Sequence, residues 1–175
     1  MRDSRPPQSC FAAQPLYTPE QRKRRDNSPW TIVQGILAPL QFVVFLVSLM
    51  LVARFLLAGI GEIPATFSIV AKTIVLYAIM ITGSLWEKEV FGRYLFAPAF
   101  FWEDVVSMGV IALHTAYLAV LLLKIGTPNQ QMYIALAAYA AYVINAAQFV
   151  WKLRMARLHS HTHVATQHNL ARSVP

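Results

Sequence analysis

The stretch WTIVQGILAPLQFVVFLVSLMLVA, residues 30–53, decides the fold class, because none of its 24 side chains carries a charge. About 20 helical residues cross a hydrocarbon core roughly 30 Å thick. Backbone polar groups cannot stay unpaired in lipid, so a stretch of this kind must be helical. Ser28 suits the N-cap position before this helix, and Pro29 suits its first turn. The sequence therefore predicts a transmembrane helix here.

Three further apolar stretches follow. The second covers about residues 65–86 and carries one charge, Lys72; the third covers residues 105–123, with a start as early as Pro98; and the fourth covers residues 125–151. Each is long enough to span a bilayer. The sequence therefore predicts an all-α, polytopic membrane protein, folded as a bundle of four transmembrane helices.

The composition excludes a soluble domain. Of the 175 residues, 57% are hydrophobic and only 13% are charged, against roughly a quarter charged in ordinary globular proteins. The net charge of +7 would suit nucleic acid, but the basic residues lie at the ends of apolar stretches, where they set membrane topology. We therefore expect no nucleic-acid partner. A single cysteine, Cys10, excludes an intrachain disulfide and a multi-cysteine metal site.

The positive charges also predict the orientation. An even number of spans places the N-terminal tail, the loop between the second and third spans, and the C-terminal tail on one side. That side carries nine flanking cations, and the other carries two, Arg54 and Lys124. The nine are Arg22, Lys23, Arg24, Arg25, Lys88, Arg93, Lys152, Arg154 and Arg157. Both termini are therefore predicted to be cytoplasmic.

Two polar tails flank the predicted transmembrane domain of residues 29–155. Residues 1–28 are basic and proline-containing, and residues 156–175 are polar, so disorder is predicted for both. The C-terminal tail contains His159, His161 and His163, but nothing in the pattern holds three imidazoles in tetrahedral geometry. We therefore predict a surface tail there and no metal site.

The connection between residues 86 and 104 is the most unusual part of the chain. It holds four of the eight acidic residues: Glu87, Glu89, Glu103 and Asp104. It also holds seven aromatic residues: Trp86, Phe91, Tyr94, Phe96, Phe100, Phe101 and Trp102. Aromatic side chains are common anchors at a membrane interface. A carboxylate at the edge of a span, however, needs a partner, water or a function.

Helical periodicity predicts which polar residues face the bundle interior. On the third span one line contains Glu103, Ser107, Val110, His114 and Tyr117; on the second, Thr73, Tyr77, Met80, Ser84 and Glu87; on the first, Gln34, Gln41 and Ser48; and on the fourth, Tyr142, Asn145, Gln148 and Lys152. Interhelical hydrogen bonding is the simpler explanation of such lines, especially for the glutamines.

Several kinds of chemistry are excluded. A haem held by two histidines needs a pair, but only His114 lies inside a span, and no phosphate loop, Rossmann glycine pattern or nucleophile elbow is present. The kinds of function that are not excluded are acid–base chemistry on a lipophilic molecule and binding of such a molecule.

Five segments of the chain resemble the 3-vinyl bacteriochlorophyllide hydratases of bacteriochlorophyll biosynthesis. They are LYTPEQRKRRDNSPW (16–30), VQGILAPLQF (33–42), WEKEVFGRYLFAPAFFWEDVVSM (86–108), ALHTAYL (112–118) and AAYVINAAQFVWKLR (140–154). The resemblance implies a hydro-lyase of the bacterial inner (cytoplasmic or intracytoplasmic) membrane. Such an enzyme adds water to the C3 vinyl group of chlorophyllide a or 3-vinyl bacteriochlorophyllide a and gives a 1-hydroxyethyl group.

That reaction needs no cofactor, only a proton donor and a base. We predict that Glu87 is the acid, because the helix dipole and partial burial disfavour its anion, although Lys88 acts the other way. Glu103 or Asp104 is the predicted base. His114 is either an axial ligand of the substrate magnesium or a structural hydrogen-bonding residue. The other predicted substrate-binding residues are Tyr77, Trp86, Lys88, Arg93, Tyr94, Phe101, Trp102 and Tyr117.

Two alternatives belong to other functional classes. A non-catalytic tetrapyrrole carrier or assembly factor needs the aromatic residues but not the acids, and a small transporter would use Lys72 and the polar lines. The expected partners are the lipid bilayer and a magnesium chlorin. Four short helices enclose a chlorin poorly, so we also expect a homo-oligomer or direct transfer from other enzymes of the pathway.

Overall fold

The computed structural model describes the backbone of residues 16–172 and the side chains of residues 16–155. Within that part of the chain there are five helices: α1 (Pro19–Asn27), α2 (Pro29–Ala58), α3 (Glu62–Phe91), α4 (Phe101–Leu122) and α5 (Pro128–Arg172). The last four are long and apolar enough to cross a membrane, α5 over Pro128–Met155. The predicted all-α fold with four spans is confirmed. The orientation of the termini stays a prediction.

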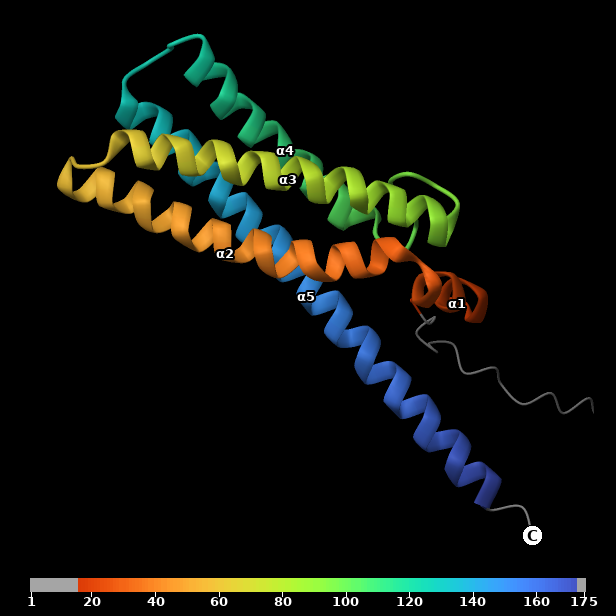
Figure 1. Cartoon of the computed structure of the whole chain (residues 1–175). Helices are drawn as coiled ribbons and strands as arrows, with labels where there is room; N and C mark the ends of the chain where they lie inside the picture. The colour runs from red at the N-terminus through yellow and green to blue at the C-terminus, as the bar shows by residue number, and fades with distance from the viewer. Residues whose placement is uncertain (1–15, 173–175) are drawn as a thin grey trace, which may run out of the picture.

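The four long helices form two hairpins. α2 packs along α3, and α4 packs along α5 (Figure 1). Further contacts of α5 with α2, and of α4 with α3, join the two hairpins. The turn between α2 and α3 is tight because Gly59 and Gly61 both have left-handed backbone angles, φ 68° and 94°, which glycine adopts without steric cost.

The helix α1 lies where the composition predicted disorder up to residue 28. The Thr18 side chain accepts a hydrogen bond from the Gln21 amide at 3.2 Å, and the Gln21 side chain accepts one from the Thr18 amide at 2.9 Å. This capping box starts the helix. The buried Tyr17 ring then docks it, stacked on Phe91 at 5.8 Å. Residues 1–15 lie outside the described part of the chain.

The helix α5 also extends beyond its predicted end. Its backbone continues to Arg172 and projects from the bundle (Figure 1), although the composition predicted disorder from residue 156. No glycine or proline stands between Pro128 and Pro175, so the sequence contains no helix breaker there. The side chains of His159, His161 and His163 lie outside the described residues.

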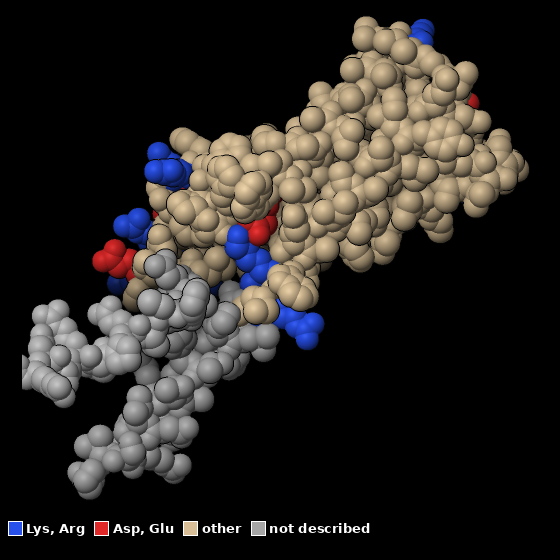
Figure 2. All heavy atoms as spheres, turned by 180° about the vertical axis from the view of Figure 1, so that it is seen from behind, with Lys and Arg blue, Asp and Glu red and all other residues tan. Residues whose placement is uncertain are grey.

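Charged side chains gather toward one end of the molecule, and the long middle section is almost free of them (Figure 2). Apolar side chains cover most of the surface of the four long helices, and Leu57, Phe67 and Leu122 are among the most exposed. Such a surface is suited to lipid. The interior line predicted for the third span is confirmed, because Glu103, Ser107, Val110, His114 and Tyr117 are all buried.

Candidate active site

Two acidic side chains meet at the charged end of the bundle. Glu87 lies in the last turns of α3, and Asp104 lies in the first turn of α4; both are buried. Asp104 Oδ2 accepts a hydrogen bond from the Phe96 amide at 2.7 Å, and Glu87 Oε2 accepts one from the Ala97 amide at 3.3 Å. The two carboxyl groups are close enough to interact with each other. Two successive amides of the connecting loop therefore hold a carboxyl pair.

The backbone of this loop is strained. Phe96 has a left-handed φ of 59°, which is unusual for a bulky residue and costs about 1–3 kcal/mol at such sites. The Phe96 ring packs against Phe101, with the ring centroids 5.8 Å apart. Together with the hydrogen bond to Asp104, this contact fixes the loop over the carboxyl pair.

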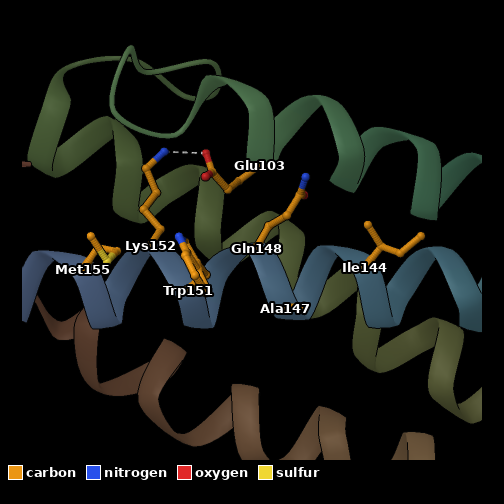
Figure 3. A pocket seen from close by; sticks show the side chains of 7 residues that line it. All are labelled: Glu103, Ile144, Ala147, Gln148, Trp151, Lys152 and Met155. Atoms are coloured by element: carbon orange, nitrogen blue, oxygen red, sulfur yellow. Dashed lines mark hydrogen bonds and ion pairs between the residues drawn. The ribbon is translucent and has the colours of Figure 1, made fainter.

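The neighbouring acid, Glu103, faces a different helix. Its Oε2 accepts a hydrogen bond from Lys152 Nζ at 2.6 Å, and this ion pair joins α4 to α5. The pair lies at an open groove of about 660 Å³ (Figure 3). The α5 residues that line the groove are Ile144, Ala147, Gln148, Trp151, Lys152 and Met155.

The groove borders a column of polar side chains between α4 and α5. Asn145 Nδ2 donates to Ser107 Oγ at 2.8 Å. Gln148 Oε1 and Asn145 Oδ1 are buried, and neither has a hydrogen-bond partner among the described residues. Buried acceptors are almost always satisfied, so these two oxygens are unusual, and of the two residues only Gln148 lines the groove.

The aromatic residues predicted to bind substrate divide into two groups. Trp86 is packed within the protein, where its Nε1 donates to Thr31 Oγ1 at 2.9 Å and its ring meets Phe91 and Phe100. Tyr94, Phe101 and Trp102 are exposed. Trp86 therefore stabilises the end of the bundle, and the three exposed rings offer apolar surface beside the acids.

The other predicted binding residues are also spread over the bundle. Lys88 and Arg93 are exposed, and Lys88 Nζ lies 4.7 Å from the centroid of the Tyr94 ring. The Tyr77 hydroxyl hydrogen-bonds Thr115 Oγ1 at 2.7 Å, which links α3 to α4. The structure therefore does not gather these residues around the carboxyl pair as one site.

His114 belongs to a second polar cluster, at the centre of the bundle. Its Nε2 lies 3.3 Å from Lys72 Nζ, and its Nδ1 lies 2.8 Å from the Val110 carbonyl oxygen. The Lys72 ammonium lies 4.0 Å from the centroid of the Tyr142 ring. His114 and Tyr117 are fully buried, so they do not line the groove. On α4, His114 lies ten residues beyond Asp104, or roughly 15 Å along the helix axis.

Two residues that line the groove are not among the predicted site residues. The charge of Lys152 indicates the orientation, and the place of Gln148 on a polar line indicates interhelical hydrogen bonding. Their shared line with Tyr142 and Asn145 at helical spacing was the available signal, and the line does face α4. Within the described part of the chain, no group of three or more His, Cys, Asp or Glu side chains is arranged to hold a metal ion.

Comparison with known proteins gives a consistent result. The family model described as 2-vinyl bacteriochlorophyllide hydratase (BCHF) matches residues 17–155. The 2-vinyl bacteriochlorophyllide hydratase of Rhodobacter capsulatus is 69% identical over 144 residues, which cover 82% of this chain and 83% of that protein. The protein of the same name from Cereibacter sphaeroides is 68% identical over 144 residues, covering 82% and 89%. No solved structure matches.

The family description places the vinyl group at position 2, whereas the resemblance in the sequence analysis placed it at position 3. Both describe hydration of a vinyl group on a bacteriochlorophyllide. The match also includes the carboxyl pair, the connecting loop and the groove, because all of them lie within residues 17–155.

Proposed function

Because this chain belongs to the 2-vinyl bacteriochlorophyllide hydratase family, we propose that it is a membrane hydro-lyase of bacteriochlorophyll biosynthesis. Its reaction adds water to the vinyl group of a bacteriochlorophyllide-type pigment. The observation that carries this function is the identity of 68–69% to two named hydratases over 82% of the chain. The buried acids and the apolar groove supply the chemistry and the surface that such a reaction needs.

The reaction consists of two proton transfers and one bond to oxygen. An acid protonates the terminal vinyl carbon, and the macrocycle delocalises the cation left on the carbon attached to the ring. A water oxygen then bonds to that carbon while a base takes the water's extra proton. The vinyl group thus becomes a 1-hydroxyethyl group. The acid is left without its proton and the base carries one more, so a proton returns from the base to the acid, directly or through solvent, before the next turnover.

The Glu87–Asp104 pair is the proposed acid. Both side chains are buried, and each accepts a hydrogen bond from the same loop. Two neighbouring buried carboxyl groups share a proton more readily than they carry two negative charges. The pair therefore holds a proton next to the helix turn that carries Glu103, although of the three acids only Glu103 lines the groove itself.

Glu103 is the proposed base. Its Oε2 accepts a hydrogen bond from Lys152 Nζ at 2.6 Å, and its side chain lines the groove. Gln148 lines the same groove, and a turn of its side-chain amide toward the groove would let its Oε1 accept a hydrogen bond from the attacking water. Glu103 takes the proton from that water, and Gln148 acts as a positioning residue.

The protein is proposed to lie in the bacterial inner membrane with both termini in the cytoplasm. The nine flanking cations on one side against two on the other support this orientation. The groove is lined by exposed apolar side chains such as Ile144 and Trp151, so an apolar pigment reaches it from within the bilayer.

The function is tested with membranes in which this chain is the only pigment enzyme. Incubation with chlorophyllide a is expected to give a product heavier by one water. The variants Glu87→Gln, Asp104→Asn and Glu103→Gln are expected to lose hydration by about a hundredfold or more. Glu62→Gln, an exposed acid at the opposite end of α3, is the matched control and is expected to keep full activity.

Pigment binding is measured in parallel by absorption titration. Retained binding with lost hydration in the acid variants supports the acid–base assignment. Near-normal hydration in all three variants would show that the carboxyl groups do not carry the reaction. Pigment binding without any conversion by the unchanged protein would favour a carrier.

A further inference from the structure

We propose that Lys152 binds a carboxylate of the pigment, so that the groove between α4 and α5 accepts the free acid and discriminates against its ester. This inference rests on the proposed function and adds the group by which the substrate is selected. Lys152 is the one cation that lines the groove among the residues that the structure describes. Its neighbours along the groove, including Ile144, Ala147 and Met155, are apolar.

The Lys152 ammonium has donors to spare. An ammonium group carries three N–H donors, and one of them goes to Glu103 Oε2. Among the described residues that is the only hydrogen bond of the Lys152 side chain, whose Nζ also lies 5.0 Å from the centroid of the Phe100 ring. The Lys152 side chain is 26% exposed and that of Glu103 is 10% exposed, so the cation is the more accessible partner. In Figure 3 the Lys152 side chain rises from α5 toward Glu103 at one end of the groove.

The other cations near this end are less suited to the groove. Lys88 lies beside the Tyr94 ring, and Arg25 pairs with Asp26 at 2.7 Å. Arg154 is exposed and does not line the groove. A carboxylate on a pigment that fills the groove therefore meets Lys152.

The groove matches a flat pigment with a charged edge. Trp151, which is 71% exposed, and Ile144 offer apolar surface for the macrocycle, and Lys152 stands at the polar end. A charge-assisted hydrogen bond is strong where water is scarce. An ester of the same carboxyl group lacks the negative charge, so it leaves the free donors of Lys152 without an anion. Hydrogen bonds to charged groups correspond to about tenfold to hundredfold in affinity.

The test compares chlorophyllide a with its methyl ester as substrates. For the unchanged protein in native membranes we expect kcat/KM to favour the free acid by about tenfold or more. Lys152→Gln is expected to remove this preference, whereas Lys152→Arg keeps the cation and is expected to keep the preference. Arg154→Gln, an exposed cation on the same helix that does not line the groove, is the matched control and is expected to behave like the unchanged protein.

The ratio of the two substrates is the informative quantity, because Lys152→Gln also removes the partner of Glu103 and lowers both rates. Equal kcat/KM for acid and ester in the unchanged protein would overturn the inference without any variant and leave the hydratase function intact. A preference that persists in Lys152→Gln would overturn it as well. Hydration of neither pigment would instead overturn the proposed function, and this inference with it.

Discussion

Two adjacent residues at the start of α4 have different partners, and this difference creates the proposed site. Successive residues on a helix point about 100° apart. Asp104 therefore faces the loop amide of Phe96, whereas Glu103 faces Lys152 on α5. One acid joins a second carboxyl group, and the other joins a cation. Neighbouring carboxyl groups thus receive the opposite environments that acid and base roles require.

The axial-ligand hypothesis for His114 leads to a prediction at the same scale. Both ring nitrogens already have partners, Lys72 and the Val110 carbonyl. We expect His114→Gln to leave the absorption bands and the affinity of bound chlorophyllide unchanged. The same variant is expected to lower the thermal stability, because Lys72 loses a partner in the bundle interior. A shift of the pigment bands in His114→Gln would favour magnesium ligation.

At the scale of the helix, the C-terminal end of α4 is strained, because a lysine occupies a backbone position that favours glycine. The Ile125 amide donates to the Val120 carbonyl at 2.9 Å, and the Lys124 amide donates to the Leu121 carbonyl at 3.2 Å. These two bonds form a Schellman motif. Its left-handed position is held by Lys124 with φ 54°, where glycine is the usual residue.

Replacing Lys124 by glycine is therefore expected to stabilise the protein by about 1 kcal/mol, because a left-handed conformation costs that much for a residue with a Cβ atom. The measurement is thermal unfolding in detergent micelles. Lys124→Ala removes the same charge but keeps the Cβ atom, so it is expected to give no such gain. Equal midpoints for the two variants would contradict the strain argument.

At the scale of the whole molecule, the charges gather toward the end where α1, the α3–α4 loop and the middle of α5 meet (Figures 1 and 2). The turn between α2 and α3 lies at the other end. If the charged end is cytoplasmic, the proposed acid–base site lies near the cytoplasmic face of the membrane. A substrate made in the cytoplasm or held in the bilayer then reaches the site without crossing the membrane.

The predicted orientation is tested by labelling with a membrane-impermeant maleimide. The native Cys10 marks the N-terminal side, and Ile60→Cys in a Cys10→Ser background marks the exposed α2–α3 turn. In spheroplasts with the outer face exposed we expect labelling at position 60 and not at Cys10. In inverted membrane vesicles we expect the reverse. Labelling of Cys10 in intact spheroplasts would contradict cytoplasmic termini.

Local patterns were sufficient for the spans and for the buried face of α4. Uncharged runs of about 20 residues identify a membrane helix without further information, and a 3.6-residue period identifies its buried side. Composition failed at α1, where a capping box and the docking of Tyr17 override a basic, polar sequence. In α5 the backbone is helical to Arg172, and disorder from residue 156 stays a prediction.

The carboxyl pair and the Lys152 contact needed the packed bundle. No spacing rule relates Glu87 to Asp104, because a non-helical loop stands between them and its strained residue Phe96 sets their approach. Nor does any rule relate Glu103 to Lys152, since their contact depends on how α4 rests on α5. Helical faces follow from bonds within one segment. Contacts between segments depend on how whole helices fit together, which is why the sequence predicts the acids and does not predict their partners.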